Sequence, residues 1–201
     1  MDLKQRSVIW SREGSFGAEF AEITILRNKL LAIGVQVGSD PVPYRVDYSL
    51  ETSVSFETRS MQVKASGEGW HRALSLLRSA EGWSAEMQQD GEPSFQEWSS
   101  ETPALADALD CDLGFSPVTN TMPFLREGIL DGGGPIDITV AWISVPDLSV
   151  TPERQRYTFL GSEPGISIVR FESLDGAFAA DIRVDSDGVV IEYPGIASRV
   201  G

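Results

Sequence analysis

Residues 110–126 read DCDLGFSPVTNTMPFLR and join a short strand-like run to the start of a helix. Ser116 can accept hydrogen bonds from the first free N–H groups of a helix, and Pro117 has the backbone angle that the first helical position requires. Pro123 lacks the N–H of a helical hydrogen bond, so we expect it to kink or end the helix. The stretch therefore predicts one short helix bracketed by two prolines.

This short helix carries a dense group of small polar side chains. Thr119, Asn120 and Thr121 are consecutive, and Arg126 follows in the same segment. The apolar residues beside them are Phe115, Met122 and Phe124. The mixture predicts a partly buried polar cluster instead of a solvated loop. Its members either satisfy backbone groups at the helix ends or hydrogen-bond a ligand, and the sequence leaves both interpretations open.

Elsewhere the chain alternates apolar and polar residues with a period of two, which is typical of β-strands. The alternating stretches include residues 31–37, 44–50, 136–142 and 178–184. The phase reverses near Arg59 and Ser60, which predicts a β-bulge, and the turn residues at 185–188 predict a hairpin. Strand-like runs at intervals of about ten to fifteen residues predict a mainly β, antiparallel fold. Residues 1–201 are expected to form one domain.

The segment around TNTMP (residues 119–123) resembles the signature of the Putative glycolipid-binding family of bacterial proteins. That signature reads Asp-Val-Asp-Leu, then Ser-Pro, then Thr-Asn-Thr-Leu-Pro-Ile-Arg-Arg-Leu. The resemblance continues around Trp142, through Pro152 and Tyr157, and across residues 178–194. It covers most of the chain after residue 105, whereas the first hundred residues match only in pattern.

Three positions depart from the family signature: Cys111 replaces Val, Leu125 replaces the first Arg, and Glu127 replaces Leu. The missing arginine argues against an anion clamp built from two arginines.

The resemblance implies a strongly curved antiparallel sheet, a half barrel wrapped around one short helix, similar to the bacterial lipoprotein carriers. The predicted bulge agrees with this architecture, because bulges and small residues allow a sheet to curve. The helix after Ser116 would then lie inside the concave face. The resemblance also implies a lipid or glycolipid ligand.

The composition excludes several classes of function. The 16 Lys and Arg residues against 30 Asp and Glu give a formal net charge of −14, so nucleic acid is not an expected partner. The longest apolar run is broken by Gly34 and Gln36, and the first residues lack a signal-peptide pattern. We therefore expect a cytoplasmic protein without stable membrane insertion. The single cysteine excludes an internal disulfide and a multi-cysteine metal site. We expect no metal or cofactor, and the sequence does not determine the oligomeric state.

Candidate catalytic residues are few. Asp110 and Asp112 share one face of a strand and could titrate as a coupled pair, although acids at this spacing commonly cap turns. His71 is the one histidine and has no nucleophile motif near it. Cys111 lies between two acids, which raise a thiol pKa and disfavour a reactive thiolate. We assign no catalytic residue and favour a non-enzymatic role.

The favoured hypothesis is binding of a lipid or glycolipid in the concave face of the curved sheet. A sheet bent around one small helix is expected to leave an apolar groove, with the polar cluster at its mouth. The aromatic residues could line this groove or form ordinary core. The expected ligand-binding residues are Asp112, Thr119, Asn120, Thr121, Arg126, Trp142 and Tyr157.

Two alternatives are left open. One is an enzyme that acts on a glycosylated or acylated small molecule through Asp112 and Asn120. The other is a protein-interaction domain that uses an exposed sheet edge or the polar segment 86–102, which is expected to be a long loop or irregular edge.

Overall fold

The alternating segments become strands of one continuous sheet in the computed structural model, which describes residues 3–93, 95 and 97–201. The first half of the chain forms β1 (Lys4–Arg12), β2 (Gly17–Leu26), β3 (Lys29–Gly38), β4 (Tyr44–Thr52), β5 (Thr58–Gly67), β6 (Trp70–Ser79) and β7 (Gly82–Gly91). The second half forms β8 (Asp110–Leu113), β9 (Ile136–Ile143), β10 (Val150–Glu163), β11 (Ile166–Ser173), β12 (Ala179–Asp185), β13 (Val190–Tyr193) and β14 (Ala197–Arg199). The strand order is β7-β6-β5-β4-β3-β2-β1-β14-β13-β12-β11-β10-β9-β8.

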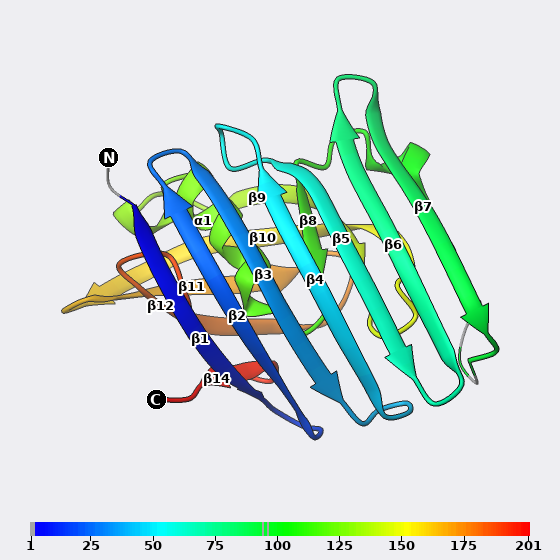
Figure 1. Cartoon of the computed structure of the whole chain (residues 1–201). Coiled ribbons are helices and arrows are strands. Elements are labelled where there is room, and N and C mark those ends of the chain that lie inside the picture. The colour runs from blue at the N-terminus through cyan, green and yellow to red at the C-terminus, as the bar shows by residue number, and fades with distance from the viewer. Residues whose placement is uncertain (1–2, 94, 96) are drawn as a thin grey trace.

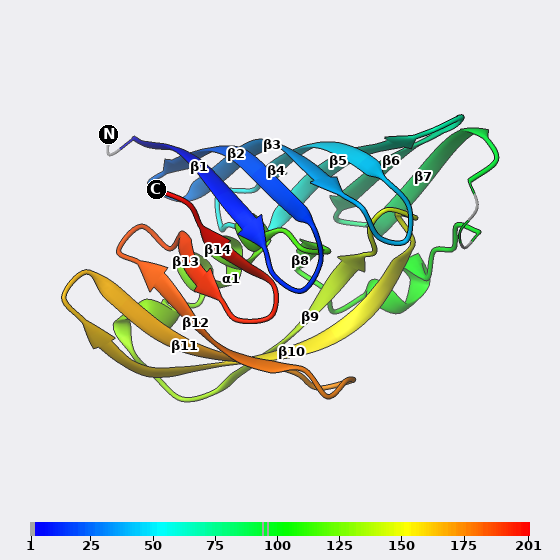
Figure 2. The same ribbon diagram turned by 90° about the horizontal axis from the view of Figure 1, so that it is seen from below.

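The sheet bends into two facing layers (Figures 1 and 2). Strands β1–β7 form the first layer and β9–β13 the second, and β14 pairs with β1 to join them. Neighbouring strands run antiparallel, except that β8 pairs with β9 in parallel. The prediction of a mainly β, strongly curved, unclosed sheet around one short helix is confirmed.

Strand β8 and the helix lie between the layers (Figure 2). The Thr58 N–H of β5 donates to the Leu109 carbonyl at 2.9 Å, and the Cys111 N–H donates to Thr58 Oγ1 at 2.9 Å. The last strand of the sheet order thus reaches back to the first layer. This fold-back brings the 110–126 segment into the interior of the bent sheet.

The predicted helix forms, but its local chemistry differs from expectation. Pro117–Asn120 is a 3-10 turn, and α1 (Thr121–Arg126) follows directly. Ser116 makes no side-chain cap to the turn, and its hydroxyl donates to the Glu19 carboxylate at 2.6 Å. Pro123 lies in the first turn of α1, where N–H groups have no helical partner. The helix therefore continues past Pro123 to Arg126 instead of ending there, contrary to the expectation. Further 3-10 turns are Thr102–Leu105 and Ile129–Asp131.

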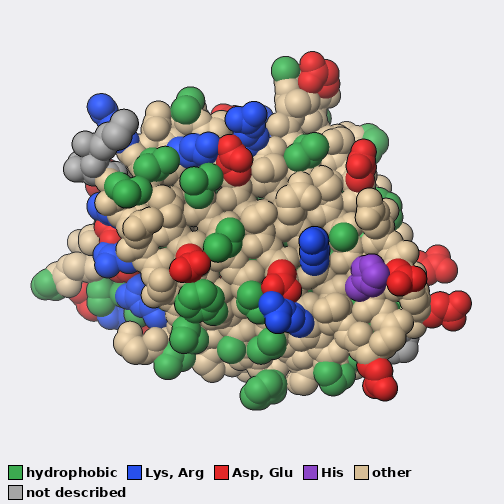
Figure 3. Space-filling model, viewed as in Figure 1, with side chains coloured by type: hydrophobic (Ala, Val, Ile, Leu, Met, Phe, Trp, Pro, Cys, Tyr) green, Lys and Arg blue, Asp and Glu red, His purple; other side chains and the backbone are tan. Residues whose placement is uncertain are grey.

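Gly34 and Gly38 lie on the inward face of β3, together with Leu30, Ala32 and Gln36. Gly34 and Gly38 lie against the rings of Tyr48 and Tyr44, and a Cβ on either glycine would come within 2.4 Å of a ring atom. Glycine is the residue that permits this approach. Leu31, Ile33, Val35 and Val37 alternate with these residues and lie on the outer face, where Ile33 is 54% exposed. Hydrophobic side chains are visible across this face in Figure 3.

Two local predictions are confirmed. Glu51 pairs with Ser60 and Thr52 with Thr58, so the register shifts by one residue at the predicted bulge. The residues between β12 and β13 form the predicted hairpin turn, with Gly188 at a φ of 81°.

The polar segment 86–102 is only partly irregular. Residues 86–91 belong to β7, which corrects the expectation of a loop there, and residues 94 and 96 lie outside the described part. Trp98 donates its indole N–H to the Leu148 carbonyl at 2.9 Å, which holds the irregular part against the turn after β9.

Side chains fill the space between the layers. Val118, Met122 and Phe124 of the helical segment are at most 1% exposed, and Leu113 and Trp10 are equally buried. The interior is thus mostly filled, and an apolar groove for acyl chains inside the bent sheet stays a prediction. The helix is itself the filling of the concavity.

Candidate functional site

A pocket of about 150 Å³ remains between the layers, beside the 112–116 segment. It is lined by Asp112, Leu113, Gly114, Phe115, Ser116, Asn120, Trp142, Glu153, Phe171, Ser173, Phe178, Tyr193 and Ile196. Three residues that the sequence analysis expected to bind a ligand are among them: Asp112, Asn120 and Trp142. We call this space the Asp112 pocket. It is smaller than the roughly 300–1,000 Å³ of pockets for drug-sized ligands, so it suits one ring or head group.

Asp112 reaches the pocket from β8 and is held by two neutral donors. The Thr119 hydroxyl donates to Oδ1 at 2.7 Å, and the Gln155 amide donates to Oδ2 at 2.7 Å. Burial raises the pKa of Asp112 to about 6 despite these bonds, and the charge of Glu153 contributes in the same direction. The carboxylate is thus ionised above about pH 6 without a salt bridge to any described cation.

Asn120 begins a chain of hydrogen bonds behind the pocket. Its Nδ2 donates to Tyr157 Oη at 2.9 Å, and that hydroxyl donates to Gln155 Oε1 at 3.0 Å. Because Gln155 in turn donates to Asp112, the chain fixes the orientation of both amide side chains.

Glu153 is the second carboxylate of the pocket. It shares one face of β10 with Gln155 and Tyr157, because side chains alternate along a strand. Ser173 donates its hydroxyl to Glu153 Oε1 at 2.8 Å, and Gln155 Nε2 lies 3.2 Å from Oε2. A single amide nitrogen therefore serves both Asp112 and Glu153.

Aromatic rings form the apolar part of the lining. Phe171 lies 5.9 Å from Phe178 and 5.7 Å from Tyr193 between ring centroids, and the latter two are 6.1 Å apart. Trp142 and Phe115 also line the space. The Asp112 pocket thus combines flat apolar surfaces with hydrogen-bond acceptors.

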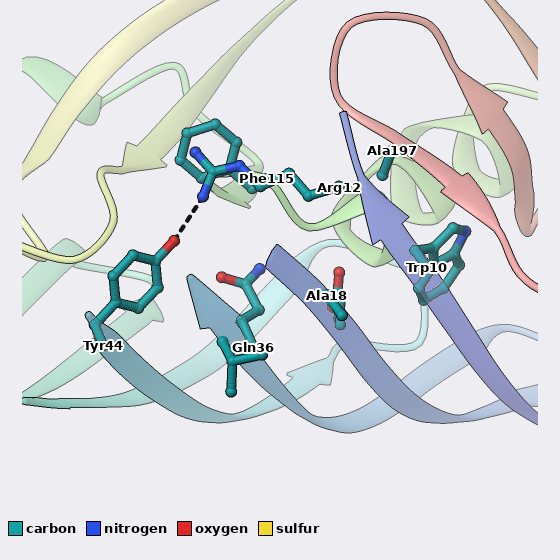
Figure 4. Close-up of a pocket in the computed structure, with 9 residues that line it drawn as sticks. Trp10, Arg12, Ala18, Gln36, Tyr44, Phe115 and Ala197 are labelled. Atoms are coloured by element: carbon teal, nitrogen blue, oxygen red, sulfur yellow. Dashed lines mark hydrogen bonds between the residues drawn. The ribbon is translucent and has the colours of Figure 1, made fainter. Parts of the chain in front are cut away.

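Phe115 separates the Asp112 pocket from two other spaces. A hollow of about 330 Å³ shares Phe115 and Trp142 with it and is further lined by Ser99, Ser144, Val145, Asp147, Ser149 and Thr151. Phe115 has a φ of 63°, an uncommon value for a residue with a bulky side chain. Arg12 holds it from the other side, with the guanidinium carbon 3.1 Å from the ring centroid and an N–H donated to Tyr44 at 2.8 Å (Figure 4).

Glu19 lies in the third space, a niche of about 10 Å³ that Arg12 and Phe115 help to line. Its Oε1 accepts the hydroxyls of Tyr48 at 2.5 Å and Ser116 at 2.6 Å. Burial raises the pKa of Glu19 to about 7, against these hydrogen bonds. Its Oε2 has no hydrogen-bond partner among the residues described. The niche is about the size of one water molecule.

Three of the other expected binding residues do not line the Asp112 pocket. Thr119 and Tyr157 lie behind it and position Asp112 and Asn120. Thr121 is fully buried and donates its hydroxyl to the Gly188 carbonyl at 2.8 Å. A direct ligand contact for these three residues stays a prediction.

Arg126 is also engaged inside the protein, with Asp110 and, at 2.7 Å, with Glu127. Asp110 thus has a cationic partner, whereas Asp112 has neutral donors and lines the pocket. Cys111 points away from both, and burial raises its pKa to about 12, as expected for an unreactive thiol. His71 lies on the outward-facing side of β6 and is 58% exposed.

Outside segment 110–126, six lining residues were not expected from the sequence: Glu153, Phe171, Ser173, Phe178, Tyr193 and Ile196. Phe178 and Tyr193 belong to the closing stretch that resembles the family, so a signal was available for them. Glu153 and Ser173 meet only because β10 and β11 pair, with Gln155 opposite Ser173.

Comparisons with known proteins agree with this fold. The family model described as "Putative glycolipid-binding" matches residues 7–199. The crystal structure of a DUF1089 family protein from Pseudomonas aeruginosa is similar at 30% sequence identity and a TM-score of 0.69, over 90% of this chain and 92% of the other. No curated protein sequence matches the chain. Within the described residues, no helix has both the length and the apolar character needed to cross a bilayer.

Proposed function

This chain belongs to the Putative glycolipid-binding family, and we propose that it binds the polar head group of a glycolipid, without catalysis, in the Asp112 pocket. The lining carries the proposal: two carboxylates, an amide and several aromatic rings converge on about 150 Å³. A sugar ring has an apolar face and a rim of hydroxyls, so rings can pack against one while polar side chains bind the other.

The filled interior changes the mode of binding from the one that the sequence suggested. The mostly filled interior favours recognition of the head group over the acyl chains. The hollow of about 330 Å³ that shares Phe115 and Trp142 would take the next part of the head group. The acyl chains would stay outside the bent sheet.

Octyl glucoside tests this proposal directly, because it carries one sugar on a short chain. We expect saturable binding in a calorimetric titration below its micelle concentration. An octyl detergent without a sugar should not bind. Trp142→Ala should weaken binding about tenfold, the ratio that corresponds to loss of roughly 1.4 kcal/mol of ring contact. Phe16→Ala is the matched control, because Phe16 is 78% exposed and does not line the pocket. Equal binding of both detergents, or binding unaffected by Trp142→Ala, would contradict the proposal.

An enzymatic role through Asp112 and Asn120 is the second candidate. The favouring observation is the pKa of about 6 at Asp112, next to a second carboxylate. Binding has stronger support because both oxygens of Asp112 accept hydrogen bonds from the protein and Asn120 Nδ2 is committed to Tyr157. Turnover of nitrophenyl glycosides that Asp112→Asn abolishes, while the variant remains folded, would decide for the enzyme.

A further inference from the structure

The charge of the Asp112 pocket narrows the class of ligand, on the premise that this pocket binds a head group as proposed above. Its lining includes two acids, Asp112 and Glu153, and no Lys, Arg or His is present among the thirteen lining residues. An anionic head group, such as a phosphate or an acidic sugar, would therefore meet like charges.

The hydrogen bonds to these two acids leave their charges uncompensated. Their donors are neutral side chains: Thr119, Gln155 and Ser173. The arginines closest in sequence are paired elsewhere, Arg126 with Asp110 and Arg154 with Asp175. Burial raises the pKa of the Tyr193 hydroxyl well above its usual range, and the charges of Asp112 and Glu153 add to this shift. Tyr193 lines the same pocket.

Two further features favour a positively charged group over a neutral one. Aromatic faces attract cations through their quadrupole, and Phe171, Phe178 and Tyr193 form a contiguous aromatic wall. Asn120 is 4% exposed and lines the pocket; its Nδ2 is used by Tyr157, while its Oδ1 accepts no hydrogen bond from any residue described. An ammonium group has three donors and no acceptor, which matches two carboxylates and an amide oxygen.

We infer that the head group bound in the Asp112 pocket carries a protonated primary amine, which Asp112, Glu153 and Asn120 Oδ1 receive and the aromatic wall faces. An amino sugar and an ethanolamine group share this chemistry. The sugar hydroxyls that the proposed function requires favour the amino sugar.

A calorimetric comparison at about pH 7 tests the inference. The ligands are methyl glucosaminide, methyl glucoside, methyl N-acetylglucosaminide and ethanolamine. We expect methyl glucosaminide to bind about tenfold more tightly than the two neutral sugars, a ratio equivalent to roughly 1.4 kcal/mol. Ethanolamine, which lacks the ring, should bind more weakly than methyl glucosaminide. If ethanolamine binds as tightly as methyl glucosaminide, the inference of an amine stands but the assignment to an amino sugar is overturned.

Glu153→Gln provides the decisive variant, since glutamine keeps the acceptor for Ser173 and removes the charge. It should lower the affinity for methyl glucosaminide more than the affinity for methyl glucoside, so that the preference for the amine falls. Glu172→Gln is the matched control, because Glu172 precedes Ser173 on β11 and alternation places it on the opposite face of the sheet. Lowering the pH to about 5 protonates Asp112 and should also reduce the preference for the amine.

The results separate the inference from the proposed function. If all three sugars bind equally and Glu153→Gln changes nothing, the amine is excluded while head-group binding stands. If no ligand binds, the proposed function fails together with the inference. A preference for the amine that Glu172→Gln removes as effectively as Glu153→Gln would show that overall charge, not the pocket, is responsible.

Discussion

Glu19 and Asp112 are two acids on either side of Phe115, and they differ most in the space beside them. Each accepts hydrogen bonds from uncharged side chains, and burial raises the pKa of each, to about 7 and about 6. The niche beside Glu19 measures about 10 Å³, whereas the pocket beside Asp112 measures about 150 Å³. A shifted pKa therefore does not separate a ligand-facing acid from a structural one; the available space does.

Asp110 completes the comparison as a buried acid that has a cation. It is two residues from Asp112 on the same strand, yet it contacts Arg126 instead of the pocket. Asp110 is thus paired with a cation, Glu19 is unpaired in an enclosed niche, and Asp112 is unpaired beside an open pocket. Substitutions at or beside these acids should differ in effect accordingly.

Removing the cation beside Asp110 should destabilise the protein most. Arg126→Met keeps the aliphatic stem and removes the guanidinium, which leaves Asp110 buried without a counter-ion. We expect a loss of about 3 kcal/mol in the free energy of unfolding, measured with urea. The control is Arg170→Met, whose partner Asp181 and own side chain are about half exposed, and little change is expected there. Equal effects of the two variants would contradict the distinction between them.

Glu19→Gln should increase stability at high pH. The folded pKa of Glu19 is about 7 against an ordinary value of 4.5, so between these values the folded state retains a proton that the unfolded chain has lost. The resulting loss in the free energy of unfolding is absent below about pH 4.5, grows as the pH rises, and is complete above about pH 7. At about 1.36 kcal/mol per pKa unit it amounts to roughly 3 kcal/mol. Urea unfolding at about pH 5 and pH 8 measures it as the difference between wild type and variant.

Asp112→Asn is the companion variant for this pH series. The pKa of Asp112 rises from 3.8 to about 6, so the loss that it causes should develop at lower pH than that of Glu19 and be complete above about pH 6. Coincident pH windows for the two variants would show that the acids are coupled instead of separate.

Gly34→Ala should disturb the Glu19 side without touching the Asp112 pocket. The added Cβ would come within 2.4 Å of the Tyr48 ring, whose hydroxyl donates to Glu19. We expect a loss of about 1–3 kcal/mol, the range for overpacking a filled interior. Gly134→Ala is the control, since nothing lies within 4 Å of its Cβ position. Ligand affinity should be unchanged in both, and a loss of affinity in Gly34→Ala would link the two regions.

Removing one hydroxyl donor from Glu19 or from Asp112 should cause the smallest losses of stability, and the loss should differ between the two acids. Ser116→Ala takes a donor from Glu19, which cannot replace it within a niche of about 10 Å³. Thr119→Val takes a donor from Asp112, which water in the pocket can partly replace. We expect about 1–2 kcal/mol for the first and less for the second, from thermal or urea unfolding above about pH 7. The reverse order would refute the role assigned to available space.

The sequence predicted local features well and interior contents poorly. The bulge near Arg59 and the turn before Val189 follow from residue types that act over a few positions, and both form. The groove stays a prediction, because alternation shows which residues share a face but not how much volume the opposite layer occupies. Likewise, Ser116 had the right chemistry for a helix cap, and only the fold shows that its hydroxyl donates to Glu19 instead.

The candidate site shows the same division. Asp112, Asn120 and Trp142 could be named from one segment and one family resemblance, and the structure places all three around one pocket. Glu153 could not be named, because an acid on a strand gives no sign of whether it faces solvent or another acid.

By itself, the sequence determined the class of fold and the helix after Ser116. Among possible partners it excluded only nucleic acid. These results follow from periodicity, turn chemistry and net charge, which are properties of neighbouring residues or of the whole composition. The tertiary structure decided which acids are paired, closed or open, and how much space the bent sheet leaves. Those quantities depend on contacts between residues far apart in the chain, such as Ser116 with Glu19 and Gln155 with Asp112.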